Sequence, residues 1–217
     1  MIAKKVIDTK AEKKWEKMRN SYEYVAARID SKPKSGRYNI DLIDLVLVSN
    51  FKGGYASIAE RYENLDVKLK AYTDGIYIIA KSFKRKKLQR LNKAQLNMLC
   101  EQAQSFLQLT LSEKTKIDGF GPSNASALLN IYFPDLLPIL DRRVLSGAKI
   151  CVKKNKQGQV TKIERHYKKL IEYVHRRLSK DKRLSIESLD KKLFSIPILE
   201  EQKSPTKPRR RNMHHGR

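Results

Sequence analysis

The chain has few cysteines, few acidic residues and no long apolar run, and each shortage excludes a class of protein. Its 217 residues include two cysteines, Cys100 and Cys151, too few for a disulfide framework or a four-cysteine metal site. Because it has no run of about 18 apolar residues, we expect no transmembrane helix. The opening Met1-Ile-Ala-Lys-Lys lacks the apolar stretch of a secretory signal. We therefore expect a protein of the reducing cytoplasm, without membrane contact.

Basic residues outnumber acidic residues about two to one. Lys and Arg total 47 against 23 Asp and Glu, which gives a formal net charge of +24. This surplus exceeds what solubility requires. It favours a polyanionic partner, most often nucleic acid, whose phosphates the cations would neutralise. The apolar fraction of 40% is ordinary for a globular chain, so we also expect a well-formed hydrophobic core.

Apolar residues recur at helical spacing along most of the chain. Gaps of three and four residues predict helices around 15–29, 65–83, 96–107 and 167–178. The apolar run 40–48 fits a helix or a buried strand by periodicity, and its helical neighbours favour a helix. We therefore predict an all-α fold.

Two segments depart from the helical pattern. Residues 150–163 could form a short hairpin or a basic loop, and the pattern does not decide between them. Residues 203–217 are basic, contain proline and lack an apolar anchor, which predicts a disordered tail. We predict one helical domain over residues 1–202, within the usual size of a single domain.

The segment 116–144 carries the most informative pattern. Gly119 and Gly121 allow a tight turn and a close backbone approach, and Pro122 suits the first position of a helix. A glycine turn that opens a helix presents free N–H groups, which bind phosphate. We expect Phe120 to fill the space between the two flanking helices. A simple interhelical turn would show the same short pattern.

The longer pattern resembles the helix-hairpin-helix of the DNA glycosylase superfamily, with the hairpin over residues 116–131. That family follows its hairpin with an apolar lead and an aspartate, which here are residues 138–140 and Asp141, and then a valine, here Val144. The lead, and the interval of twenty residues between Gly121 and Asp141, look like the mismatch-specific adenine glycosylase branch. The resemblance implies a two-lobed helical domain that holds double-stranded DNA between its lobes. Outside 116–144, only the number and order of helices fit.

Three positions depart from the family pattern. Asp118 replaces the hairpin proline, and Ser146 stands where a basic residue is common. Ser123 occupies the position of the lysine that combined glycosylase/lyase members use, so the resemblance implies a monofunctional enzyme that uses water. With two cysteines the chain lacks the iron–sulfur cluster of many relatives, and we expect no cofactor and no metal.

Asp141 is the catalytic carboxylate that the resemblance implies. Cleavage of an N-glycosidic bond builds positive charge on the sugar, which a fixed carboxylate stabilises or relieves by taking a proton from water. An aspartate in front of a helix also serves as an N-cap, and the two roles are compatible. The same resemblance places DNA contacts at five residues: Lys116, Gly119, Gly121, Ser123 and Arg142.

The residues of the base pocket cannot be identified from the sequence. Residues 44–50 loosely resemble the family stretch that supplies a second acid and a wedge, which would be Asp44 and Asn50. Asp44 also fits a capping or exposed aspartate. Trp15, Tyr72 and Tyr77 could stack on a base, although aromatic residues at helical spacing are more often part of a core.

The combined prediction is a DNA glycosylase that removes a damaged, mispaired or modified base flipped out of duplex DNA. One alternative is a non-catalytic helix-hairpin-helix DNA-binding protein in which Asp141 only caps a helix. Another is an RNA-binding protein that uses the basic surface. We expect a monomer in the cytoplasm, associated with the nucleoid if the source is bacterial.

Overall fold

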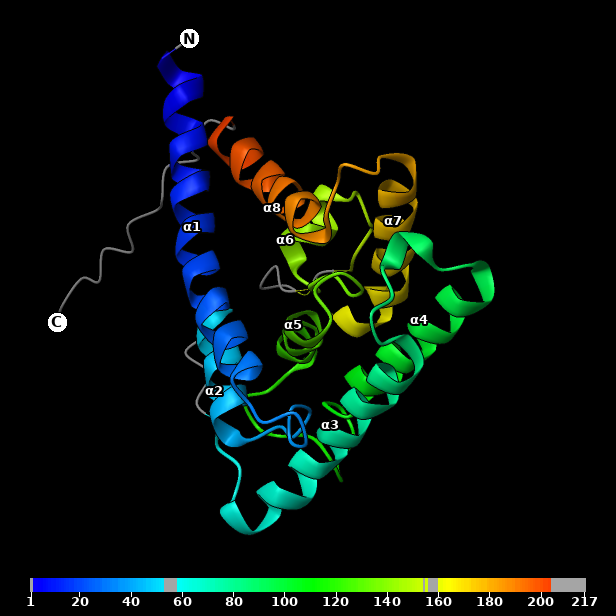
Figure 1. Cartoon of the computed structure of the whole chain (residues 1–217). Coiled ribbons are helices and arrows are strands. Elements are labelled where there is room, and N and C mark those ends of the chain that lie inside the picture. The colour runs from blue at the N-terminus through cyan, green and yellow to red at the C-terminus, as the bar shows by residue number, and fades with distance from the viewer. Residues whose placement is uncertain (1, 53–57, 154, 156–159, 204–217) are drawn as a thin grey trace, which may run out of the picture.

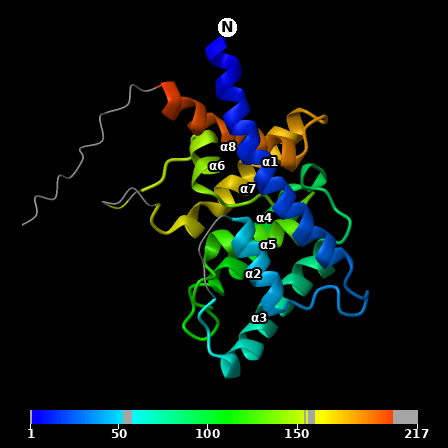
Figure 2. The same cartoon turned by 90° about the vertical axis from the view of Figure 1, so that its left-hand side faces the viewer.

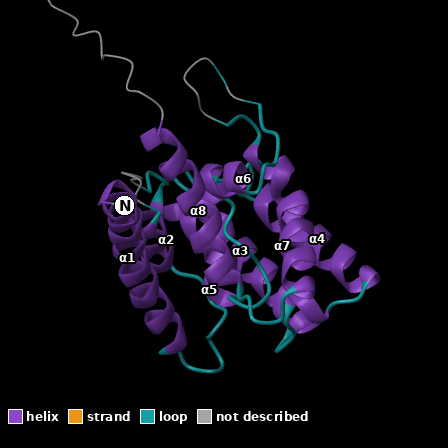
Figure 3. Cartoon of the chain, turned by 90° about the horizontal axis from the view of Figure 1, so that it is seen from above, coloured by secondary structure: helices purple, strands orange, loops and turns teal. Residues whose placement is uncertain are grey.

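The computed structural model describes residues 2–52, 58–153, 155 and 160–203, and this part of the chain is all-α (Figure 3). Two short 3-10 helices accompany the α-helices, and no sheet forms among the described residues. The all-α prediction is therefore confirmed. The eight α-helices are α1 (Ile2–Asp30), α2 (Leu42–Phe51), α3 (Tyr62–Phe83), α4 (Lys93–Gln108), α5 (Pro122–Tyr132), α6 (Arg142–Gly147), α7 (Tyr167–Lys180) and α8 (Ile186–Lys203).

The four helices predicted from apolar spacing correspond to α1, α3, α4 and α7. The ambiguous run 40–48 forms α2, which begins at a capping box. The Asp41 side chain accepts a hydrogen bond from the Asp44 N–H, and the Asp44 side chain accepts one from the Asp41 N–H. These reciprocal bonds satisfy donors that a helix start would otherwise leave free, and so favour a helix over a strand.

The segment 150–163 contains no strand among its described residues. The Thr161 N–H donates to the Lys153 carbonyl at 3.0 Å, which closes a loop and not a ladder. Residues 154 and 156–159 of this segment lie outside the described residues, and so does the tail from 204 to 217.

The long α1 runs along one side of the molecule, with α2 and α8 packed against it, while α3 and α4 pack against each other on the opposite side (Figure 1). α5 contacts α1, α2 and α4, and residues 125–131 within it are all buried. Figure 2 shows α8 crossing α1, with α6 beside α8. α5 therefore forms a central support for the segments that follow it.

An aromatic cluster fixes the turn in front of α5 to the core. The rings of Phe120 and Tyr72 stand edge to face with centroids 5.7 Å apart, and the Tyr72 and Phe106 rings are 5.6 Å apart. Phe120 is 1% exposed, so its burial is as predicted, and its ring contacts Tyr72 of α3, a helix that does not flank the turn. Burying these rings anchors a turn whose neighbouring glycines contribute no side-chain packing.

Candidate functional site

The glycine turn between α4 and α5 forms as the sequence predicts. Gly119 has a φ of 87°, the left-handed conformation that glycine adopts without strain. The Phe120 N–H donates to the Ile117 carbonyl at 2.9 Å and closes the turn. Gly121 is the N-cap of α5 and Pro122 the first helical residue, and no side chain caps this helix start. The first N–H groups of α5 are thus left without a side-chain acceptor.

Gly121 itself does not need to be glycine for conformational reasons. Its φ is −89°, which any residue adopts, and a Cβ added there would meet no atom within 4 Å. The open space beside Gly121 is what a close approach by a phosphate would require.

The segment 137–140 is held in place by side chains, where a sheet would use ladder bonds. The Ser123 hydroxyl donates to the Leu140 carbonyl at 2.7 Å, and the Leu140 N–H donates to Ser126 Oγ at 2.8 Å. Both serines belong to α5. Ser123 was predicted to contact DNA. In the structure its hydroxyl is hydrogen-bonded to the carbonyl of Leu140, the residue just before Asp141. The position of Asp141 is therefore fixed by the same helix that the glycine turn begins.

Asp141 is the N-cap of α6 and also half of a largely buried charge pair. Its Oδ1 accepts from the Arg143 N–H at 2.8 Å, and its Oδ2 accepts from Lys52 Nζ at 3.0 Å. The side chains of Asp141 and Lys52 are 19% and 7% exposed. The capping role expected from the sequence is thus present. Lys52, at the end of α2, was not identified from the sequence.

The Asp141 carboxyl is held in its ionised form. Burial acts to raise its pKa, but the nearby Lys52 ammonium and the Arg143 N–H lower it more, so the pKa lies below the ordinary aspartate value. An ionised carboxylate in a largely enclosed place can stabilise a developing positive charge without first losing a proton.

The other two predicted DNA contacts, Lys116 and Arg142, lie at the surface. Lys116 stands before the glycine turn, is 40% exposed and pairs with Glu113 at 2.6 Å, which raises the pKa of the Lys116 ammonium. Arg142 is exposed at the start of α6, directly after Asp141. The Ser123–Leu140 hydrogen bond links the helix that follows the glycine turn to the segment just before Asp141 and Arg142.

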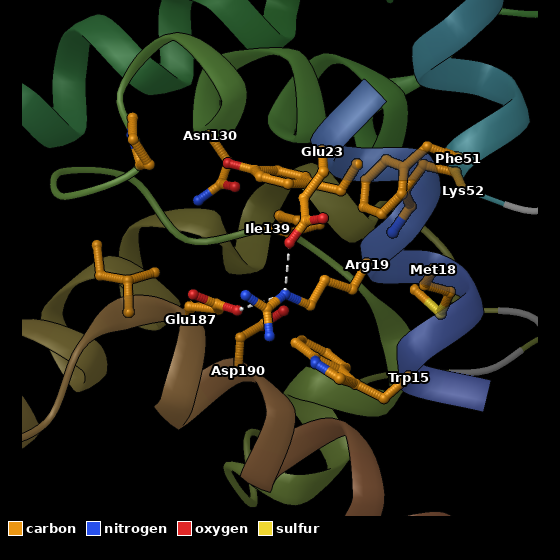
Figure 4. Close-up of a pocket in the computed structure, with 13 residues that line it drawn as sticks. Trp15, Met18, Arg19, Glu23, Phe51, Lys52, Asn130, Ile139, Glu187 and Asp190 are labelled. Atoms are coloured by element: carbon orange, nitrogen blue, oxygen red, sulfur yellow. Dashed lines mark hydrogen bonds and ion pairs between the residues drawn. The ribbon is translucent and has the colours of Figure 1, made fainter. Parts of the chain in front are cut away.

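A pocket of about 200 Å³ lies next to the charge pair (Figure 4). Its residues come from α1, the end of α2, the end of α5 with the loop that follows it, and α8. Three aromatic residues, Trp15, Tyr22 and Phe51, contribute to its walls. The pocket was not identified from the sequence, because its walls come from segments far apart in the chain. The full lining is Trp15, Met18, Arg19, Tyr22, Glu23, Phe51, Lys52, Asn130, Pro134, Ile139, Ile186, Glu187 and Asp190.

Asp190 is a second acid at this site. Its Oδ1 is enclosed and has no hydrogen-bond partner among the described residues. Burial raises the pKa of Asp190 to about 7, with Lys52 opposing the shift and Asp141 adding to it. The environment thus shifts the pKa values of these two carboxyls in opposite directions. Asp141 is ionised at neutral pH, whereas Asp190 holds its proton up to about pH 7. No pattern in the sequence marks Asp190.

Exposed charges stand at the solvent-facing side of the pocket. The Arg19 Nε lies 2.8 Å from Glu23 on the same helix and 3.5 Å from Glu187 on α8 (Figure 4). All three side chains are more than half exposed. Ion pairs of this kind contribute little to stability, so they can rearrange when a ligand enters.

Asp44, the second acid suggested by the loose resemblance, has a structural role. Its carboxylate is fully buried, accepts from Arg28 Nε at 3.2 Å and pairs with Lys32. It is also the acceptor of the capping box at the start of α2. With these partners Asp44 holds the α1–α2 connection.

Within the described part of the chain, no three His, Cys, Asp or Glu side chains gather as a metal site requires. Searched over the same residues, the helices include none with the length and apolar character needed to cross a membrane. No protein-family model, no curated protein and no solved structure matches the chain.

Proposed function

We propose that the protein is a DNA glycosylase that hydrolyses the N-glycosidic bond of a damaged, mispaired or modified base, with Asp141 as its catalytic carboxylate. The observation that carries this proposal is the ionised Asp141, paired with Lys52 at the edge of an aromatic-walled pocket. A flipped base would enter the pocket and bring its sugar towards the carboxylate. The net charge of +24 supports a partner rich in phosphate.

Asp141 would act on the sugar while the bond to the base breaks. Positive charge then builds at C1′ and its ring oxygen, and a fixed carboxylate stabilises that charge or accepts a proton from the attacking water. Lys52 keeps the carboxylate ionised before DNA arrives. In the complex a DNA phosphate would compete for the Lys52 ammonium and release Asp141 Oδ2 towards the sugar.

The DNA would lie across the surface that carries the glycine turn and the start of α6. The unsatisfied N–H groups of α5, Lys116 and Arg142 would bind phosphates there. In this proposal the helices form two lobes, one around α1 and α8 and one around α3 and α4, with the duplex between them.

The decisive experiment incubates the protein with duplexes that each contain one modified or mispaired base, followed by alkali. Base release leaves an abasic site, which alkali converts to a strand break. We expect breaks at one class of base with the wild type and none with Asp141→Asn. Asp135→Asn is the matched control, because Asp135 is an exposed acid that pairs with Lys87 at 3.4 Å, outside the pocket.

A non-catalytic DNA-binding protein is the second candidate, and one observation favours it. Both oxygens of Asp141 already have partners, Arg143 N–H and Lys52 Nζ, as a purely structural residue would. Wild-type protein that binds every duplex of the panel and releases no base would support this alternative.

A further inference from the structure

Asp190 is not used by the chemistry proposed above, yet it lines the pocket. It stands on α8, and its Oδ1 is enclosed without a hydrogen-bond partner among the described residues. Figure 4 shows Asp190 close to Trp15, which extends towards it from α1. A buried polar atom without a partner is costly, so the group is suited to a bound ligand that completes its hydrogen bonding.

Burial, more than the neighbouring charges, sets the protonation state of Asp190. Burial raises its pKa to about 7, so the acid is protonated at slightly acidic pH. Tyr22 stays neutral over this range, because burial, followed by Glu187 and Asp190, raises its pKa above the ordinary value. α7 contributes no residue to the pocket lining. The other charged groups near the pocket are Lys52, Asp141, Arg143, Arg19, Glu23 and Glu187.

The remaining walls suit a flat ring. Trp15, Tyr22 and Phe51 present aromatic surface, with the Tyr22 and Phe51 rings edge to face at 5.5 Å. Ile139 and Ile186 add aliphatic surface. The volume of about 200 Å³ is many times what one water needs. Aromatic walls with few polar groups are typical of sites for ring-shaped ligands, and the polar groups fix the orientation.

We propose that this pocket binds a nucleobase with its ring against the aromatic walls, and that protonated Asp190 donates a hydrogen bond to an acceptor on the edge of that base. Asp190 is thus a specificity-determining residue. A base that presents a ring nitrogen or carbonyl acceptor to Oδ1–H is held, and a ring without an acceptor is not. This inference rests on the proposed function for the source of the base, but not for the binding itself.

Ligand binding in the pocket can be followed by tryptophan fluorescence, because Trp15 lines the pocket and is the only tryptophan of the chain. The experiment titrates the full-length protein with adenine, and separately with each of the four deoxynucleosides, and follows Trp15 fluorescence. We expect saturable quenching at about pH 6. At about pH 8.5 we expect roughly thirtyfold weaker binding than at about pH 6, because only about 3% of an acid of pKa about 7 is then protonated. Toluene, a flat ring without an acceptor, should give no saturable quenching at either pH.

Three variants test the role of Asp190 directly. Asp190→Asn keeps the shape and donates through its amide at every pH, so its binding should be the same at both pH values. Asp190→Leu should bind weakly at both. Asp66→Asn makes the same charge change on an exposed acid of α3 outside the pocket, and it should behave as the wild type.

Two results would overturn the inference: no saturable quenching by any of the five probes at about pH 6, or a pH dependence that persists in Asp190→Asn. The titration involves no bond cleavage. Base binding without base release from DNA would therefore refute the proposed enzyme and keep this inference. Base release without pH-dependent base binding would refute this inference alone.

Discussion

Lys52 Nζ lies 3.0 Å from Asp141 Oδ2, although the two residues are 89 positions apart in the chain. The pair ties the end of α2 to the start of α6. Removing one partner of such a largely buried pair strands the other charge, whereas apolar replacement of both is often tolerated. Each function proposed for Asp141 must therefore be separated from its role in holding these helices.

Asp141→Asn should abolish base release and retain DNA binding, although the unpaired Lys52 ammonium should lower the free energy of unfolding. An asparagine keeps the N-cap of α6, and loss of a negative charge should maintain or raise DNA affinity. We expect single-turnover base release to fall by about a hundredfold or more, as for removal of an electrostatic stabiliser. Electrophoretic binding assays measure affinity in parallel. An Asp141→Asn protein with full glycosylase activity would leave the residue only its capping role.

Gly121→Ala should weaken DNA binding without destabilising the protein. An added Cβ meets nothing within 4 Å and the φ of −89° suits alanine, so only a ligand that approaches the turn closely would be blocked. Gly119→Ala differs, because its φ of 87° strains alanine and should lower stability by about 1 kcal/mol. Binding isotherms and urea unfolding separate the two effects. Unchanged binding by Gly121→Ala would show that the turn does not anchor DNA.

The local features of this site were predictable, and the contacts between distant segments were not. The turn at Gly119, the helix start at Pro122 and the cap at Asp141 depend on neighbouring residues, whose conformational preferences the sequence displays. The pairing of Lys52 with Asp141 depends on how α2 packs against α5, which no periodicity encodes. Lysines are numerous in this chain, so residue type alone could not single out Lys52.

Helix prediction from apolar spacing identified some helices and missed α8. Apolar spacing marks α3 and α7, because one face of each is buried and the other is polar. α8 was not identified, and Asp190 on it carries no local signal. Ser123 shows a different limit, because its resemblance-based role concerned DNA while its hydroxyl bonds the Leu140 carbonyl.

The raised pKa of the buried acid Asp190 should make the free energy of unfolding depend on pH. Its folded pKa of about 7 exceeds the unfolded value of about 4, so the native state keeps a proton that the unfolded state loses. The free energy of unfolding should fall as pH rises from about 4 to about 7, by a few kcal/mol at most. Asp190→Asn should flatten this slope in urea unfolding series, and Asp66→Asn should not. An unchanged slope in Asp190→Asn would place the proton elsewhere.

Gly147→Ala should disturb the contact between α6 and α8. A Cβ at Gly147 would lie 2.1 Å from the Leu193 carbonyl oxygen, a backbone atom that cannot move alone. Overpacking of this kind costs about 1–3 kcal/mol, measurable by urea unfolding. Gly36→Ala is the control, because its Cβ would make an ordinary contact of 3.5 Å with Asn39. Equal stability of the two variants would show that the helices separate easily.

Base release should leave the DNA strand intact until alkali is added, and borohydride should trap no covalent complex. A lyase forms an imine between an amine and the sugar, and the amine must first lose a proton. By the resemblance to the glycosylases, Ser123 occupies the position of the lyase lysine, and a serine has no amine. Lys52 is the lysine best placed to act as such an amine, because it contacts Asp141. The lowered pKa of Asp141 makes this carboxylate a poor acceptor for the Lys52 proton.

Lys52→Gln and Lys149→Gln are the variants that make this last prediction decisive. Lys149 is exposed just after α6 and serves as the control lysine. Lys52 is the candidate amine that the structure offers, because it is 7% exposed and lies at the pocket edge. A strong trapped band in the wild type that disappears with Lys52→Gln and persists with Lys149→Gln would contradict the monofunctional assignment. It would also make Lys52 the nucleophile, with Asp141 oriented to receive its proton.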